Sequence, residues 1–227
     1  MSGDDDTSKA AAAKPVALEA RPQGADGRRF SPSTARNKDA VREVFLAHMP
    51  KIGTILEIAS GTGEHGAHFT AAAPDLRWTY TDLDPGSRTS QAAWAAHQGQ
   101  DRLLGPYRLD TREPHWGEAE TAAPYHGLFC ANMIHIAPFD AAIGLLTGAG
   151  RVLQPGGRLM LYGPFARAGH IAPSNTQFQH SLQSRDPSWG VRDLDHEIVP
   201  LASQNGLKLE TVIEMPANNL SVIFART

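Results

Sequence analysis

The chain has 227 residues, 41% of them hydrophobic and 20% charged, and this length and composition exclude a chain that is disordered throughout. Its formal net charge of −3 and its lack of any long apolar run argue against nucleic-acid and membrane partners and favour a small-molecule substrate. A single cysteine, Cys130, excludes an internal disulfide and a multi-thiolate zinc site, and we expect a cytoplasmic protein in a reducing compartment.

The first predicted elements are a tail and a helix. Residues 1–27 contain many charged side chains, a run of alanines and no aromatic residue, which predicts a disordered tail. Ser31 followed by Pro32 is typical of a helix N-terminus, and apolar residues then recur at helical spacing until the helix ends at Pro50. The folded domain is therefore expected to extend over residues 28–227.

Strands and helices alternate after this first helix. Short apolar runs predict strands at 54–58, 77–81, 107–109, 127–131 and 158–162. The longer segments between them predict helices at 64–72, 85–97 and 140–153. Such alternation predicts a doubly wound α/β fold, in which a mostly parallel sheet carries helices on both faces. Near the C-terminus, a helix at 193–205 precedes two strands, 207–214 and 220–225, which we expect to form an antiparallel hairpin on this sheet.

The alternating pattern lapses between Gly163 and Gly190, in a stretch rich in proline, serine and asparagine. Long irregular segments of compact domains are usually functional or disordered. Because this segment contains the large aromatic residues Phe165, Phe178 and Trp189, we expect it to pack over a binding site as a substrate lid.

A glycine-rich loop joins the first predicted strand to the helix after it. Gly61, Gly63 and Gly66 match the pattern G-x-G-x-x-G, in which glycines let the backbone approach a ligand beside the unpaired N–H groups of a helix N-terminus. Asp82 follows Gly61 by 21 residues and ends the next strand, where a carboxylate binds ribose hydroxyls. We therefore expect a ligand that contains adenosine.

Three features favour S-adenosylmethionine over NAD as that ligand. Glu57 places an acid inside the first strand, where a charge is costly unless it meets a cation such as the ammonium of S-adenosylmethionine. A pyrophosphate needs glycines directly after the strand, whereas here Ala59 and Ser60 precede them. A Pro-Gly-Gly turn at 155–157, between a helix and a strand, is also a habit of methyltransferases. An NAD-dependent oxidoreductase is the less favoured alternative.

Several further motifs can be compared with a known family. They are Ser31-Pro32 with Arg36-Asn37-Lys38, the run from Leu56 to Gly63 with His65 and His68, the run from Asp82 to Pro85, and those at 132–136, 148–151, 161–165, 185–190 and 216–220. Through these motifs, residues 28–226 resemble the class I methyltransferase-like family called domain of unknown function 938, or methyltransferase-like protein 26. The resemblance implies a Rossmann-like, mostly parallel seven-stranded sheet with an antiparallel last strand, and S-adenosylmethionine as cofactor.

One position departs from the wider class I pattern. General class I methyltransferases favour glycine where this chain has Ala59, although the resembling family also carries alanine there. An alanine is tolerated provided that its φ angle is negative, which is what we expect for Ala59.

The ends of the predicted strands supply the other cofactor candidates. Asp84 directly precedes Pro85 and a helix, so it is interpreted as the helix N-cap, which leaves Asp82 as the ribose ligand. Asp110 ends the third strand, where the related fold places an acceptor for the adenine amino group, and Asn132 follows a buried strand at the carboxyl edge. The full cofactor-binding set is Glu57, Ala59, Ser60, Gly61, Gly63, His65, Asp82, Asp110 and Asn132.

His135 is the candidate catalytic residue, because a histidine beside that edge can remove a proton from an acceptor near neutral pH. A histidine packed beneath a loop is the alternative interpretation. His65 and His68 have metal-ligand spacing, but without a third ligand nearby we expect no metal, and we expect Cys130 to be a buried apolar residue. The candidate substrate-binding residues are Arg36, Asn37, Tyr162, Asn175, Asn218 and Asn219.

The leading hypothesis is an S-adenosylmethionine-dependent methyltransferase that acts on a small-molecule acceptor. In-line displacement at a methyl group depends mainly on orientation and exclusion of water, so a general base is needed only for a protonated nucleophile of high pKa. The second hypothesis is a module that binds the same ligand without catalysis and works through partners. The glycine-loop argument supports both hypotheses, because it concerns binding alone.

Overall fold

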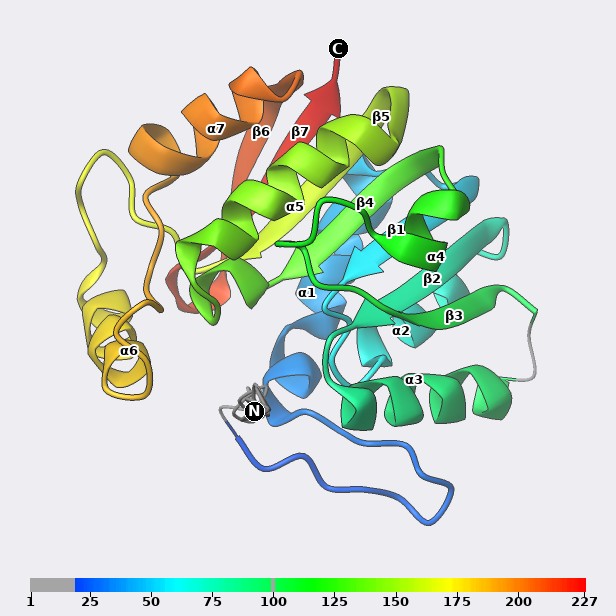
Figure 1. The fold of residues 1–227 in the computed structure, drawn as a ribbon. Coiled ribbons are helices and arrows are strands. Elements are labelled where there is room, and N and C mark those ends of the chain that lie inside the picture. Colours follow the sequence, from blue (N-terminus) through cyan, green and yellow to red (C-terminus); the bar gives the residue numbers. More distant parts are fainter. Residues whose placement is uncertain (1–18, 99–100) are drawn as a thin grey trace, which may run out of the picture.

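The structure is a computed structural model that describes residues 19–98 and 101–227. Seven strands form one sheet in the order β3-β2-β1-β4-β5-β7-β6 (Figure 1). The strands are β1 (Gly53–Ile58), β2 (Leu76–Asp82), β3 (Leu103–Arg108), β4 (Tyr125–Ala131), β5 (Leu153–Gly163), β6 (Leu207–Met215) and β7 (Asn219–Arg226). Six strands run parallel, and β7 runs antiparallel to both of its neighbours, β5 and β6. This topology confirms the predicted α/β fold and its C-terminal hairpin.

Helices cover both faces of the sheet, as the alternating pattern predicts. One face carries α1 (Pro32–His48), α2 (Glu64–Ala72) and α3 (Pro85–Gln98), and the other carries α4 (Gly117–Thr121), α5 (Phe139–Val152) and α7 (Val199–Gln204) (Figure 1). Phe45 and Phe69 pack with Trp78 on the first face, and Leu145 belongs with Phe224 to the apolar cluster of the second. Burial of these side chains holds the helices to the sheet. Among the described residues, no helix is long and apolar enough to cross a bilayer.

The segment 163–190, expected to be irregular, contains the helix α6 (Pro173–Gln183). Most residues of α6 are polar, and only Phe178 and Leu182 form an apolar pair at i,i+4 spacing. The apolar periodicity that would predict a helix is therefore weak. Pro173 in the first turn is the local start signal. The single helix expected at 193–205 is divided into a π-helical turn (Leu194–Ile198) and α7.

Two strands begin earlier than the sequence predicts. β3 starts at Leu103 rather than at residue 107, and β5 starts at Leu153 rather than at residue 158. Glycine and proline interrupt both strands near their starts, and these residues weaken the strand signal in the sequence. The carboxyl ends of the strands, which matter for the site, lie close to the predicted positions.

Residues 19–27, placed by the sequence in a disordered tail, contact the folded domain. The Glu19 carboxylate accepts a hydrogen bond from the Ser33 amide at 2.8 Å, at the first turn of α1. The folded part therefore begins before residue 28, which corrects the predicted boundary, and residues 1–18 lie outside the described ranges. Hydrogen bonds rather than apolar periodicity hold this segment, so its placement is not visible in the sequence pattern.

Candidate active site

The glycine loop runs from the end of β1 to the start of α2, at the carboxyl edge of the sheet. Gly61 and Gly63 have φ angles of 57° and 91°, in the left-handed region that glycine enters at little cost. Gly63 is the N-cap of α2, and a Cβ there would lie 3.2 Å from the Cα of Gln91. Gly66 serves packing, because a Cβ there would collide with the indole of Trp78. Two glycines thus shape the loop, and the third brings α2 close to β2.

Ala59 has a φ angle of 55°, so the expected negative φ is wrong. A left-handed conformation costs a residue with a Cβ roughly 1–2 kcal/mol, so the loop stores strain at its start. Ser60, the next residue, ties the loop to β2: its amide donates to the Thr81 carbonyl at 2.8 Å, and its Oγ accepts from the Thr81 amide at 3.1 Å. These contacts with the neighbouring strand, rather than local preference, hold the backbone of Ala59.

Asp82 anchors the loop from the end of β2. Its Oδ2 accepts a hydrogen bond from the Gly61 amide at 2.9 Å, and its Oδ1 accepts one from the Asp84 amide at 2.9 Å. Burial raises the pKa of Asp82 to about 6. A carboxylate retains lone pairs after two such bonds, so Asp82 can still accept from a diol. Asp84 accepts from the Ser87 amide at 2.6 Å and caps α3, as the sequence predicts.

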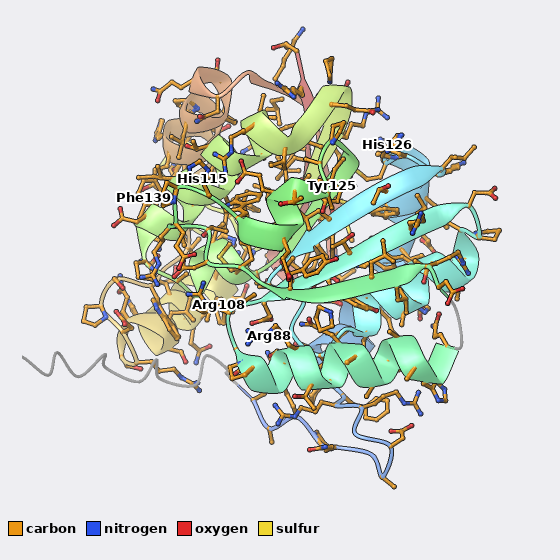
Figure 2. The ribbon with its side chains drawn as sticks, turned by 45° about the vertical axis from the view of Figure 1, so that its right-hand side comes forward. Arg88, Arg108, His115, Tyr125, His126 and Phe139 are labelled. Carbon is orange, nitrogen blue, oxygen red and sulfur yellow. The ribbon has the colours of Figure 1, made fainter. Side chains whose placement is uncertain are left out.

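Two arginines that the sequence analysis did not single out lie at the same end of the sheet (Figure 2). Arg88 of α3 donates from Nη1 to the carbonyl oxygens of Asp82 and Leu83, at 2.9 and 2.8 Å. Arg108 ends β3 in register with Asp82 and forms a bidentate pair with Glu113. Arg88 thereby fixes the turn after β2. No sequence pattern marks it, because its partners are backbone carbonyls.

Glu57 is a buried carboxyl near the end of β1, with 2% of its surface exposed. Trp78 Nε1 donates to Oε2 at 2.8 Å, and His65 Nδ1 lies 3.9 Å from Oε1. Burial raises the pKa of Glu57 to about 8 and lowers the pKa of His65 to about 3, so both side chains are uncharged at neutral pH. Within the described ranges, no lysine or arginine forms an ion pair with this carboxyl. The acid that was expected to need a cation therefore lacks one.

Polar contacts lead from Glu57 toward β5. His65 Nε2 lies 3.0 Å from Asn37 Oδ1, and burial raises the pKa of the Tyr162 phenol, a rise that the nearby Asn37 side chain opposes. Asn37 comes from α1 and Tyr162 from β5, where it is buried. The structure therefore brings two predicted substrate residues together with two predicted cofactor residues.

Asn132 and His135 occupy the turn that follows β4. Asn132 has a φ angle of 62°, and its amide donates to the Tyr162 carbonyl at 2.8 Å. His135 is fully buried: its Nδ1 accepts from the Arg192 amide at 3.3 Å, and its ring meets Phe165 edge-on at 4.8 Å between centroids. A ring nitrogen that accepts carries no hydrogen, so the hydrogen of the neutral imidazole lies on Nε2.

This geometry contradicts the expected role of His135 as a general base. Burial lowers its pKa to about 3, and the hydrogen on Nε2 makes that nitrogen a donor rather than an acceptor. Nε2 has no hydrogen-bond partner among the described residues, and a Cβ on Gly163 would lie 2.6 Å from it. The alternative interpretation, a histidine packed beneath a loop, is the one that the structure shows. Sequence reasoning could not choose, because the deciding residue, Arg192, is 57 positions away.

Asp110 lies just beyond the end of β3. Its carboxylate oxygens accept hydrogen bonds from Arg112 Nε at 2.9 Å and from Arg112 Nη2 at 2.6 Å. The hydrogen bonds from the Arg112 side chain hold the pKa of this carboxyl below its usual range. Asp110 is therefore a charged acceptor at the carboxyl edge, and its contact with an adenine amino group stays a prediction.

Three predicted substrate residues form a separate cluster beside α6. Asn175 is buried and donates from Nδ2 to the Asn218 carbonyl at 2.9 Å, and Asn218 Nδ2 donates to Ser174 Oγ at 2.8 Å. Asn219 hydrogen-bonds within the same turn, between β6 and β7. These bonds tie α6 to the C-terminal hairpin, which is a structural role that the sequence analysis did not foresee.

Three other residues singled out from the sequence lie apart from these clusters. The Arg36 side chain is 70% exposed and lies 3.7 Å from Glu19. His68 Nε2 lies 2.8 Å from Asp39 Oδ1, and the described residues contain no group of three side chains that could hold a metal. Cys130 is buried in the apolar cluster of the α5 face, as predicted.

Residues 28–226 match the family described as "Protein of unknown function (DUF938)". The chain belongs to this family. The match includes the glycine loop, Asp82 and the turn after β4, so it confirms the resemblance drawn from the sequence motifs. The family match begins at residue 28 and does not include residues 19–27, although these residues contact the folded domain in the structure.

Solved methyltransferase structures share the fold of this DUF938 protein. The mitomycin 7-O-methyltransferase MmcR has a TM-score of 0.71 at 18% identity, over 86% of this chain and 54% of that chain. An O-methyltransferase family protein from Burkholderia thailandensis has a TM-score of 0.70 at 16% identity, over 86% and 56%. A family 2 O-methyltransferase protein from Planctomyces limnophilus, in complex with apigenin, has a TM-score of 0.70 at 19% identity, over 86% and 60%. The DUF938 chain thus spans less than two thirds of each, and the likeness establishes a Rossmann-like fold.

Proposed function

We propose that this DUF938 protein is an S-adenosylmethionine-dependent methyltransferase with a small-molecule acceptor. The observation that carries the proposal is Glu57, a buried carboxyl with no cationic partner among the described residues, beside the glycine loop of a methyltransferase-like fold. The ammonium of S-adenosylmethionine is the kind of cation that such a carboxyl lacks. An NAD site has no comparable need for a buried acid at this position.

The residues of the loop fit this cofactor. Glu57 would pair with its ammonium, and Asp82 would accept hydrogen bonds from its ribose hydroxyls. Gly61 and Gly63 hold the loop in left-handed conformations, and among the described residues a Cβ on Gly61 would come within 4 Å of the Arg21 guanidinium alone, so the backbone there is open to a ligand. When bound, the cofactor supplies an electrophilic methyl group on a sulfonium centre.

The chain itself would position the acceptor and exclude water. The segment 163–190 returns to the turn after β4, where the Gly190 amide donates to the His135 carbonyl at 3.0 Å. A segment that covers this edge would restrict acceptors to small molecules and keep water from the site. The neutral, hydrogen-bearing imidazole of His135 suits an acceptor atom that needs no proton removed.

Ligand binding gives the first test. S-adenosylmethionine and S-adenosylhomocysteine should raise the melting temperature and bind in the micromolar range by calorimetry, whereas NAD should do neither. Absence of heat and of any melting shift at millimolar S-adenosylhomocysteine would refute the proposal. Mass spectrometry of small molecules that co-purify with the protein would then identify the cofactor and candidate acceptors.

A binding module without catalysis is the second candidate, favoured by the absence of a basic imidazole at His135. The two candidates differ in turnover alone. Incubation with S-adenosylmethionine and the co-purified small molecules should release S-adenosylhomocysteine if the protein is an enzyme. Binding without release across those acceptors would favour the module.

A further inference from the structure

An N-terminal strap, residues 19–31, lies against α2 and α3 and passes below α3 in Figure 1. The Arg29 amide donates to Ser90 Oγ of α3 at 2.8 Å, and the Ser31 amide donates to Glu64 Oε2 of α2 at 2.6 Å. Both partners belong to the two helices that follow β1 and β2. The strap is therefore fixed to the elements that position the glycine loop.

The strap is also held together on both sides of Arg21. Ser31 Oγ donates to the Glu19 carboxylate at 2.9 Å, and the Phe30 amide donates to the Pro22 carbonyl at 2.9 Å. Bonds to residues just before and just after Arg21 leave its backbone little freedom. The position of the Cα atom from which the Arg21 side chain extends is therefore fixed.

The guanidinium of Arg21 lies over the glycine loop. A Cβ on Gly61 would be 3.8 Å from Arg21 Nη2 and 3.9 Å from Nη1, which is ordinary contact distance. Arg21 Nε is buried and has no hydrogen-bond partner among the described residues. A buried donor without a partner is rare in folded proteins and marks a place where a further acceptor belongs.

The charges around the loop indicate what that acceptor is. Glu57, Glu64 and Asp82 place three buried carboxyl groups around it. Burial raises the pKa of Asp82, and the nearby Arg21 guanidinium opposes that rise. A ligand carboxylate brought to this place would be repelled by Asp82, and by Glu57 once that carboxyl has lost its proton to pair with an ammonium, unless a cation lay beside it. Arg36 is 70% exposed and lies near Glu19, so Arg21 is the arginine suited to this task.

We propose that Arg21 is a cofactor-binding residue, whose guanidinium binds the carboxylate of the amino-acid half of the ligand while the strap covers the loop. This inference rests on the proposed function. Guanidinium donors form a planar fork that matches a carboxylate, and such a contact would also satisfy the buried Nε. Arg21 precedes the residues 28–226 that match the family, so the family match does not assign it.

Calorimetry of the full chain with two ligands tests the assignment. S-adenosylhomocysteine contains the amino-acid half, whereas 5′-methylthioadenosine keeps the adenosine and the thioether and lacks that half. Arg21→Gln should weaken S-adenosylhomocysteine binding roughly 10- to 100-fold, through loss of hydrogen bonds to a charged group. It should change methylthioadenosine binding by less than roughly threefold. Arg21→Lys keeps the charge and should recover part of the loss.

Gln23→Ala is the matched control, because Gln23 is an exposed residue of the same strap. It should change neither affinity, and melting curves should show that all three variants are folded. Unchanged S-adenosylhomocysteine binding in Arg21→Gln overturns the assignment, and so does equal weakening of both ligands, since the contact is then not specific to the carboxylate. If the unaltered chain binds neither ligand, the proposed function itself fails. If it binds S-adenosylhomocysteine more tightly than methylthioadenosine and Arg21→Gln leaves both affinities unchanged, only the Arg21 assignment fails. Equal affinity of the unaltered chain for both ligands would overturn the pairing of Glu57 with the ammonium as well.

Discussion

Affinity for S-adenosylhomocysteine should rise with pH through neutrality, because Glu57 must lose a proton before it can pair with an ammonium. Burial raises the pKa of this carboxyl to about 8, from an ordinary value of 4.5. Each pH unit below the folded pKa costs about 1.4 kcal/mol for deprotonation. The affinity should therefore increase about tenfold per pH unit as the pH approaches 7 from below, and close to one proton should be released for each ligand bound.

The other titrating groups near Glu57 do not obscure the increase of affinity with pH above pH 6.5. The pKa of His65 is lowered by burial to about 3, so its imidazole stays neutral over the range. Burial raises the pKa of Asp82 to about 6, so its own deprotonation is mostly complete above pH 6.5, where measurements should begin. Above about pH 8 the rise should end, because Glu57 is then ionised without ligand and an amino group begins to lose its proton.

Calorimetry in buffers of different ionisation enthalpy measures the affinity and the number of protons released in one experiment. The affinity is determined at several pH values, and the dependence of the heat on the buffer counts the protons released. Glu57→Gln is the matched variant, because glutamine keeps the size of the side chain and an acceptor for Trp78. The variant should bind more weakly at pH 7.5 and lose both the slope and the proton release. An unaltered chain whose affinity is flat between pH 6.5 and 7.5, or a variant that retains the slope, would refute the reasoning.

Three further results are expected. Ala59→Gly should raise the free energy of unfolding in urea by roughly 1 kcal/mol, because glycine adopts the observed φ angle of 55° without a Cβ penalty; lower stability would contradict the strain. Asp82→Ala should weaken S-adenosylhomocysteine binding about 10- to 150-fold by calorimetry, through lost hydrogen bonds to the ribose and a loosened Gly61 amide; unchanged affinity would place the ribose elsewhere. Hydrogen exchange in residues 163–190 should slow when S-adenosylhomocysteine is added, as a lid requires, whereas equal exchange with and without ligand would make the segment a fixed scaffold.

The order of elements and the glycine loop were determined by local sequence patterns. Apolar strands that alternate with helices leave few arrangements other than a parallel sheet covered on both faces, and the observed sheet is of this kind. Asp84 precedes a proline and a helix, and it caps that helix. Such features were predictable because each depends on residues within a few positions of one another.

Other features were decided only where distant segments meet. The polar residues of α6 show little helical period, and contacts of Asn175 with the turn after β6 help to place that helix. The expected sign of φ at Ala59 was wrong, because hydrogen bonds between Ser60 and β2 determine the backbone there. Local sequence preference predicts neither α6 nor the positive φ angle of Ala59, because the residues that determine them are far away in the sequence.

The chemistry of the site shows the same division. The sequence indicated that an acid at Glu57 needs a cation, but its neutral state follows from the depth of burial that the folded sheet creates. The sequence also placed His135 near the carboxyl edge, whereas the backbone amide of Arg192 decides which ring nitrogen carries the hydrogen. Residue types and their order therefore determined which side chains gather at the carboxyl edge of the sheet. Desolvation and hydrogen bonding between distant segments decided which groups carry charge or a proton there.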